Sequence, residues 1–169
     1  MKVFKLHETV ELPAYATEGS AAFDLRAHLV DNPWVRAYNP MNREIEIPVK
    51  VVAGKLGIQI HPQYRVLVPT GLIFDIPKNN VLKIYARSGT ALKQGLTLAN
   101  AVGVVDSDYV EETFVMLLNV SEQLVVVNHG DRIAQAVVES VKQLSLTETK
   151  ERPGQKTSRN GGLGSTGKE

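Results

Sequence analysis

Short apolar segments separated by turn-forming residues run through most of this chain. Between residues 21 and 29 (AAFDLRAHL), Phe23 and Leu25 alternate with Asp24 and Arg26, which is the two-residue period of a half-buried β-strand. Asp24 is therefore expected on the face of the strand that points away from the core. We expect further strands of this kind at residues 3–6, 44–52, 57–60, 64–68, 72–76, 81–85, 113–120, 123–127 and 132–141, with a last one around 144–146.

Proline, glycine and asparagine mark the turns between these segments, as at residues 69–71 and 77–80. Only residues 87–95 have the composition of a helix, with Ser88 as the expected N-cap and Gly95 as the terminating residue. Ten or more short strands with one short helix are typical of a β-sandwich. We therefore predict an all-β fold, either a sandwich or a jelly roll.

Two regions depart from this pattern. Residues 32–55 are interrupted by prolines, among them Pro48, whose missing N–H favours an edge position, and we interpret the region as an elaborated loop or an added hairpin. Trp34, within it, is expected to cover the core rather than to bind a ligand. From Thr147 the chain becomes polar and glycine-rich. We predict a folded domain at residues 1–147 followed by a mobile C-terminal arm at 148–169.

Composition excludes several classes of protein. The 169 residues contain no cysteine, which excludes disulfides and thiolate chemistry, and the net charge of +1 leaves no basic surface for nucleic acid. The four histidines are far apart, without metal-ligand spacing, and are expected on the surface or in loops. No apolar run approaches the ~20 residues of a membrane span, and the first residues lack the features of a signal peptide. We expect a soluble, cytoplasmic protein that does not bind membranes.

The stretch at 98–112 (LANAVGVVDSDYVEE) predicts a strand, a tight turn and the start of a second strand. Asp106 stands at the end of the apolar strand. A carboxylate in that position can be partly desolvated and held in one direction, as a general base requires. The alternative is an ordinary solvated hairpin turn.

Two other segments suit phosphate oxygens. Arg87, Ser88 and Gly89 lie where the helix should begin, and backbone N–H groups there attract anions; the alternative is a capped helix with an exposed arginine. Residues 158–167 (SRNGGLGSTG) combine glycines with hydroxyl groups and an arginine. This segment lacks the P-loop spacing, and its alternative interpretation is a glycine-serine linker.

Taken in order, five motifs resemble those of the trimeric dUTPase family, the deoxyuridine triphosphate nucleotidohydrolases. They are AFDLRA (22–27), ARSGTA (86–91), GVVDSDY (103–109), GDRIAQ (130–135) and GGLGSTG (161–167). The segment VPTGL (68–72) also resembles that family. The resemblance covers about residues 4–167, apart from the insertion at 32–55.

The resemblance implies a jelly-roll homotrimer whose active sites lie between subunits and are closed by the C-terminal arm. It implies the Mg²⁺-dependent hydrolysis of dUTP to dUMP and pyrophosphate, which keeps uracil out of DNA and supplies dUMP. Asp106 would deprotonate the water that attacks the α-phosphorus. Asp24 would hold Mg²⁺ through water. Substrate would be bound by Arg87, Ser88, Gly89, Asn100, Val104, Val105, Tyr109, Gln135, Arg159, Leu163, Gly164, Ser165 and Thr166.

Within that set, the resemblance implies that Tyr109 packs on the deoxyribose, where its ring leaves no room for a 2′-hydroxyl. It also implies that Asn100 and the neighbouring backbone form hydrogen bonds with the uracil edge. Besides the insertion, the chain departs from the family pattern at four places, one of which is Ala86, where proline is common. Leu163 stands where an aromatic residue usually covers the uracil. The tail arginine usually occupies the position of Ser158 instead of Arg159, and Glu111 stands where glycine is usual.

Two other functions stay open at this level. A dCTP deaminase, or an enzyme with both activities, shares this fold and needs a catalytic glutamate, for which Glu111 and Glu112 are candidates. A non-catalytic regulatory relative would use the insertion as a partner surface.

Overall fold

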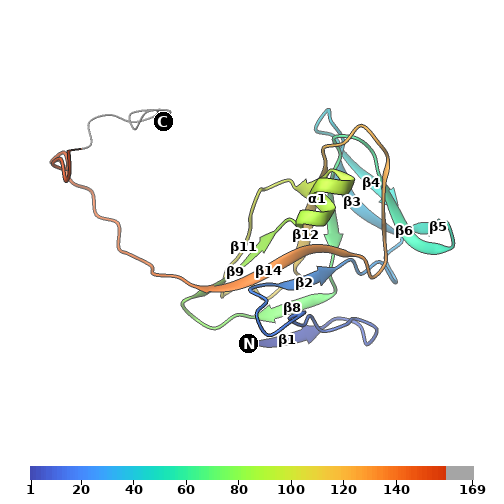
Figure 1. The fold of residues 1–169 in the computed structure, drawn as a ribbon, viewed down its shortest axis with the longest axis horizontal. Helices are drawn as coiled ribbons and strands as arrows, with labels where there is room; N and C mark the ends of the chain where they lie inside the picture. The colour runs from blue at the N-terminus through green and yellow to red at the C-terminus, as the bar shows by residue number, and fades with distance from the viewer. Residues whose placement is uncertain (159–169) are drawn as a thin grey trace.

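The computed structural model describes residues 1–158, which form a set of antiparallel β-sheets with one short helix (Figure 1). The strands are β1 (Lys2–Lys5), β2 (Phe23–Arg26), β3 (Trp34–Tyr38), β4 (Glu44–Pro48), β5 (Lys50–Val52), β6 (Lys55–Ile60), β7 (Arg65–Pro69), β8 (Leu72–Asp75), β9 (Asn80–Tyr85), β10 (Leu96–Leu98), β11 (Gly103–Val105), β12 (Phe114–Asn119), β13 (Val125–Asn128) and β14 (Arg132–Ser140). The helix α1 spans Ser88–Gln94. The predicted all-β fold with one short helix is confirmed.

Two larger sheets enclose the core. One has the strand order β10-β12-β7-β3-β4 and the other the order β11-β9-β14-β2. Alternate residues of both sheets, such as Leu25 and Leu82 in one and Val66 and Leu117 in the other, belong to a single cluster of buried apolar side chains. The period of two in the sequence therefore gives each sheet one buried face and one outward face.

The insertion at residues 32–55 contains an added hairpin and is not merely an elaborated loop. Strands β3 and β4 pair with each other, and β3 joins the five-stranded sheet through Ala37 and Tyr38, which pair with β7. The single strand expected at 44–52 is wrong, because β4 ends at Pro48 and β5 belongs to another sheet. Trp34 is 43% exposed, so the expectation that it covers the core is also wrong; Val35, one residue later, is the buried one.

Helix α1 has a different N-cap from the one expected and ends at the expected glycine. Arg87 is the N-cap, with extended backbone and no side-chain capping bond, so the assignment of Ser88 as N-cap is wrong. Gly95 ends the helix as predicted, in the left-handed region at φ +65°. A side chain there would also collide with Ser121, since a Cβ would lie 2.7 Å from the Ser121 Cβ.

The predicted hairpin around Asp106 is wrong. Strand β11 pairs with β9, and the chain then crosses to the other sheet, where β12 begins only at Phe114. A turn follows β11 directly, closed by the N–H of Tyr109 bonding to the carbonyl of Asp106 at 3.2 Å. The strand expected at 144–146 is absent too: residues 141–158 contain no helix or strand and run away from the sheets (Figure 1).

Candidate active site

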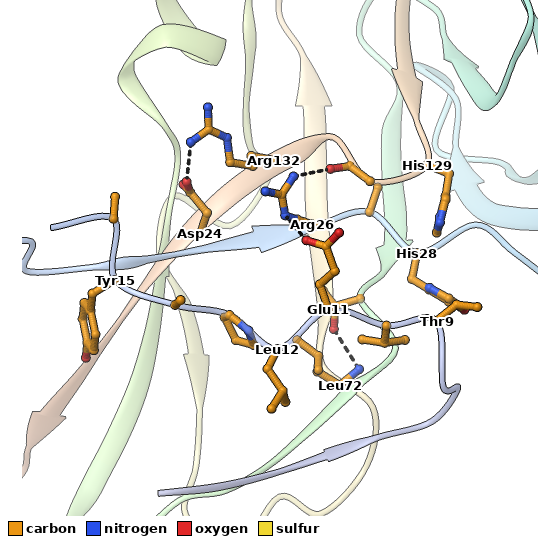
Figure 2. A pocket seen from close by; sticks show the side chains of 17 residues that line it. Thr9, Glu11, Leu12, Tyr15, Asp24, Arg26, His28, Leu72, His129 and Arg132 are labelled. Atoms are coloured by element: carbon orange, nitrogen blue, oxygen red, sulfur yellow. Dashed lines mark hydrogen bonds and ion pairs between the residues drawn. The ribbon is translucent and has the colours of Figure 1, made fainter.

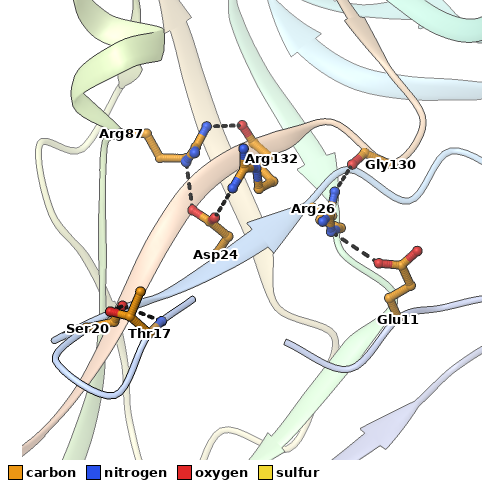
Figure 3. A network of polar contacts seen from close by, with 8 residues as sticks. All are labelled: Glu11, Thr17, Ser20, Asp24, Arg26, Arg87, Gly130 and Arg132. Atoms are coloured by element: carbon orange, nitrogen blue, oxygen red, sulfur yellow. Dashed lines mark hydrogen bonds and ion pairs between the residues drawn. The ribbon is translucent and has the colours of Figure 1, made fainter. Parts of the chain in front are cut away.

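A network of ion pairs joins three elements at one end of the four-stranded sheet (Figure 3). The Asp24 carboxylate of β2 accepts a hydrogen bond from Arg87 Nε at 2.6 Å and another from Arg132 Nη1 at 3.1 Å. Arg87 also donates to the Arg132 carbonyl oxygen at 3.2 Å. Two guanidinium groups therefore fix the direction of one carboxylate; the Arg132 side chain is half exposed and the Arg87 side chain is a quarter exposed.

Strand pairing explains why these residues meet. Gln135 of β14 lies opposite Asp24 on one side and Tyr85 of β9 on the other. Its side-chain amide donates to the Ala86 carbonyl at 2.9 Å, just before the helix. The sequence motifs that carry Asp24, Arg87 and Gln135 are thus brought together, as the resemblance implied.

Arg132 belongs to this network, and the sequence reasoning missed it. The signal was available, because Arg132 stands within the GDRIAQ motif, three residues before Gln135. Ser88 and Gly89 lie beside the network, exposed at the start of α1. Between the helix and the network lies a cavity of about 210 Å³, lined by Arg87, Thr90 and Arg132 among others.

A second, larger cavity of about 270 Å³ borders the network on its other side (Figure 2). The loop at residues 9–16 forms one wall, and Asp24, Arg26 and His28 line the opposite one. Arg26 is held by the Gly130 carbonyl at 2.7 Å and by Glu11 at 3.3 Å. This cavity is therefore polar on the side of β2.

The stretch around Asp106 forms a separate cavity of about 300 Å³. The five residues predicted from this stretch all line it, together with apolar side chains of β12; they are Asn100, Val104, Val105, Asp106 and Tyr109. Strand β11 is the last strand of its sheet, so the N–H and C=O groups of alternate residues in Gly103–Val105 point away from β9 without a neighbouring strand. Such groups can bind the edge of a planar heterocycle.

Asp106 is exposed, and among residues 1–158 no group donates a hydrogen bond to its carboxylate. The expectation that the end of the strand partly desolvates it is therefore wrong for the single chain. Burial instead affects Glu112, six residues later, whose pKa is raised because its carboxyl group is withdrawn from water. That carboxyl group accepts the N–H of Gly71 at 2.7 Å.

Within one chain, Asp106 lies far from the Asp24 network. Asp106 follows Val105, which pairs with Leu82, whereas Asp24 lies level with Tyr85 at the other end of β9. The difference is roughly 13 Å along the strands, at about 3.3 Å per residue. Two strands, β9 and β14, also stand between β11 and β2. Across the strands, the separation is therefore roughly 14 Å at the usual strand spacing.

All four histidines lie in loops, as expected, but the loops bring three of them together in a cluster that the sequence did not predict. The rings of His7 and His28 stack with their centroids 4.8 Å apart, and His129 meets His28 edge to face at 5.2 Å. His28 is buried, and its Nε2 atom has no partner within residues 1–158. Burial, followed by the charges of His7 and His129, lowers the pKa of His28.

The described residues contain no group of three or more histidine, cysteine, aspartate or glutamate side chains that could hold a metal ion by themselves. Asp24 remains suitable for an indirect role. Each of its oxygens accepts one hydrogen bond from an arginine, which leaves a lone pair on each for a metal-bound water. Mg²⁺ commonly keeps several waters and is held largely by substrate phosphates, so the residues present fit that ion.

The remaining predicted site residues lie outside the described part of the chain. They are Arg159, Leu163, Gly164, Ser165 and Thr166. The only helix of residues 1–158, α1, is too short and too polar to cross a membrane.

Comparison with known proteins adds three findings. The family model described as dUTPase matches residues 52–167. A protein of Dinoroseobacter shibae named deoxyuridine 5'-triphosphate nucleotidohydrolase is 40% identical over 162 residues, covering 95% of this chain and 90% of its own. A protein of the same name from Treponema denticola is 41% identical over 139 residues, covering 82% and 79%.

Solved structures agree on the fold. The dUTPase from Streptococcus mutans superposes with a TM-score of 0.64 at 24% identity, covering 86% of this chain and 99% of that one. The Staphylococcus bacteriophage 80alpha dUTPase gives a TM-score of 0.67 at 17% identity, covering 90% and 97%. Because the family model matches more than half of this chain and relatives near 40% identity are covered over most of their length, this chain belongs to the dUTPase family.

Proposed function

We propose that this chain hydrolyses dUTP to dUMP and pyrophosphate in the presence of Mg²⁺. Family membership supplies the reaction, and the observation that carries it to these residues is the cavity that Asn100, Asp106 and Tyr109 line together. A base-reading amide, a carboxylate and an aromatic ring on one short stretch suit a nucleoside whose phosphates extend past the carboxylate.

The base and sugar would lie against this stretch. Asn100 and those backbone groups of the Val104–Val105 stretch that point away from β9 would bond to the uracil edge, and Tyr109 would pack on the deoxyribose. A polar site of this kind rejects the wrong base strongly, because the wrong base leaves buried donors and acceptors without partners.

The phosphates would lie against the Asp24 network of another subunit. Arg87 offers charged donors, Ser88 a hydroxyl and Gly89 a backbone N–H at an exposed surface, while Gln135 anchors the segment before them. Mg²⁺, when bound through water to Asp24, would neutralise phosphate charge and fix its geometry.

Catalysis would depend on Asp106. Its carboxylate would take a proton from a water molecule as the water oxygen bonds to the α-phosphorus. The bond from that phosphorus to the bridging oxygen would break, and pyrophosphate would leave with the electron pair. Water positioning and proton acceptance by one carboxylate are the usual contribution of a general base.

A homotrimer with shared sites would bring the two parts together. One chain separates Asp106 from Asp24 by several strands, so the reaction needs residues from two copies. Apolar side chains beside the Asp106 cavity are exposed in the single chain, among them Val104 at 61% and Met116 at 46%. Exposed apolar patches of this kind are commonly covered by a partner. The arm at 148–169, with Arg159, Leu163, Gly164, Ser165 and Thr166, would then close over the substrate.

The test is pyrophosphate release from each deoxynucleoside triphosphate, with and without Mg²⁺. We expect release from dUTP alone, and only with the metal. Ammonia released from dCTP would favour the deaminase instead. If the protein turned over none of these substrates and formed a stable complex with another protein, the regulatory relative would be favoured.

A further inference from the structure

The exposed turn that carries Asp106 and Tyr109 is tethered at its far end, by Glu112. The Glu112 Oε1 atom accepts the N–H of Gly71 at 2.7 Å, and the Glu112 carbonyl oxygen accepts the hydroxyl of Tyr109 at 2.9 Å. One residue therefore connects the Tyr109 side chain to the turn between β7 and β8, which is Thr70–Gly71.

That second turn is itself held firmly. The Gly71 carbonyl accepts the N–H of Leu6 at 2.9 Å, and the buried Thr70 hydroxyl donates to the Thr113 carbonyl at 2.5 Å. Gly71 adopts φ +70°, and a Cβ there would lie 2.6 Å from a methyl group of Val10. The anchor point of Glu112 thus belongs to the tightly packed part of the molecule.

The turn itself has few restraints of its own. Residues 108–111 are exposed, and the backbone bond from Tyr109 to Asp106 at 3.2 Å only closes the turn on itself. The direction of the Tyr109 ring therefore depends on where the Glu112 carbonyl stands. That position is set at two points: the Thr113 N–H of the same peptide unit donates to the Leu72 carbonyl at 2.8 Å, and the Glu112 side chain accepts the N–H of Gly71.

We propose that Glu112 is a positioning residue that holds the Tyr109 ring against the sugar and so sets the preference for deoxyribose over ribose. This role rests on the proposed function, in which Tyr109 packs on the deoxyribose. Glu112 does not touch the substrate itself. A ring displaced by even a fraction of an ångström leaves space for a 2′-hydroxyl, so the tether determines selectivity more than rate.

The tether needs an acceptor, and it does not need a charge. The Glu112 side chain meets a neutral backbone N–H, and a glutamine side chain has the same length and a carbonyl oxygen for that N–H. Alanine removes the acceptor and leaves the Gly71 N–H without it. Glutamine should therefore preserve the tether, and alanine should break it.

The experiment compares kcat/KM for dUTP with kcat/KM for UTP in the wild type and in four variants. In Glu112→Ala and in Tyr109→Phe, which removes the hydroxyl at the other end of the tether, we expect the preference for dUTP to fall by up to about 100-fold, the cost that a misplacement of about 1 Å can have. Glu112→Gln should keep the wild-type preference. Glu111→Ala, an exposed neighbour, is the matched control and should behave like the wild type.

An unchanged preference in both Glu112→Ala and Tyr109→Phe would overturn the proposal. Should Glu112→Ala fail to fold, Tyr109→Phe alone decides, because the hydroxyl is exposed to solvent and its removal does not touch the core. A wild type that releases no pyrophosphate from dUTP would overturn the proposed function together with this role. An active wild type with unaltered variants would overturn only the role of Glu112.

Discussion

The Asp24 carboxylate lies 2.6 Å from the Nε atom of Arg87, although Asp24 belongs to β2 and Arg87 follows β9, a strand that does not pair with β2. Strand β14 stands between β2 and β9 and brings both into register through Gln135. Arg87 and Arg132 hold this carboxylate in one direction, so its orientation is a property of the sheet.

Replacing this carboxylate with an amide, in Asp24→Asn, should weaken the response to Mg²⁺. The amide loses the ion pairs with both arginines and cannot accept from metal-bound water as a carboxylate does. Changes in groups that support a metal typically lower affinity or activity by about 10–100-fold. The measurement is pyrophosphate release from dUTP as Mg²⁺ is titrated. Glu11→Gln, at an exposed ion pair with Arg26, is the control, and an unchanged Mg²⁺ curve for Asp24→Asn would exclude Asp24 from this role.

The Asp106→Asn variant should lose nearly all turnover and keep most of its affinity for dUTP. An amide cannot take a proton from water at neutral pH, whereas its size and hydrogen-bonding reach are almost those of the carboxylate. Single-turnover pyrophosphate release gives the rate, and calorimetry with a non-hydrolysable imido analogue of dUTP gives the affinity. Parallel loss of binding and turnover would assign Asp106 to substrate binding instead of catalysis.

The pattern of residues predicted the sheets better than it predicted the site. The two-residue period in AAFDLRAHL gave β2 and the outward direction of Asp24 correctly, because burial on one face is a local property. The path after Asp106 was missed, since a turn that leads to a neighbouring strand and one that crosses to another sheet use the same residues. The contact between His7, His28 and His129 depends on which loops meet at the end of the sheets, and residue spacing along the chain carries no such information.

Truncation after Gln155 should leave the β-sheets folded and reduce activity strongly. Residues 141–158 contain no helix or strand, so the truncation removes no strand from the sheets of the described residues. The arm is proposed to supply contacts to the phosphates and to exclude water. Circular dichroism and thermal unfolding check the fold, and pyrophosphate release checks the activity. Full activity in the truncated chain would remove the arm from the site.

The Gly71→Ala variant should lower the free energy of unfolding by more than Gly130→Ala does. Both glycines have positive φ, +70° and +81°, but only Gly71 lacks space for a Cβ, which would meet Val10 at 2.6 Å. A strained backbone conformation costs about 1–3 kcal/mol, and the collision adds to this at Gly71 alone. Urea unfolding of the two variants separates the cost of the backbone conformation, which both share, from the cost of the collision, which only Gly71→Ala has. Equal decreases in the free energy of unfolding would show that the Val10 side chain moves aside at no energetic cost.

Stability should decrease as the pH falls below the ordinary pKa of histidine. Burial lowers the pKa of His28 in the folded chain, and the charges of His7 and His129 lower it further, while Asp31 opposes them. The unfolded chain therefore binds the proton more readily. The contribution of His28 is fully present above about pH 6.5 and is lost as the pH falls from there toward the folded-state pKa.

The free energy of unfolding at pH 7.5 and pH 5.5 measures this effect. His28→Phe keeps an aromatic ring between His7 and His129 and removes the titration, so its stability should change less between the two pH values. His61→Phe, outside the cluster, should retain the wild-type difference. A wild-type difference that survived in His28→Phe would assign the acid sensitivity to other groups.

The hairpin β3–β4 shows where this architecture can grow. It joins the five-stranded sheet through two residues of β3 and leaves the pairing of β7 with β12 complete. Its outermost strand displays Glu44 and Glu46 and stops at Pro48, features that discourage further strands from adding by edge-to-edge association. A hairpin can thus be added at this edge of the sheet during evolution. Its last strand limits further strand addition, and the residues proposed for the chemistry keep their positions.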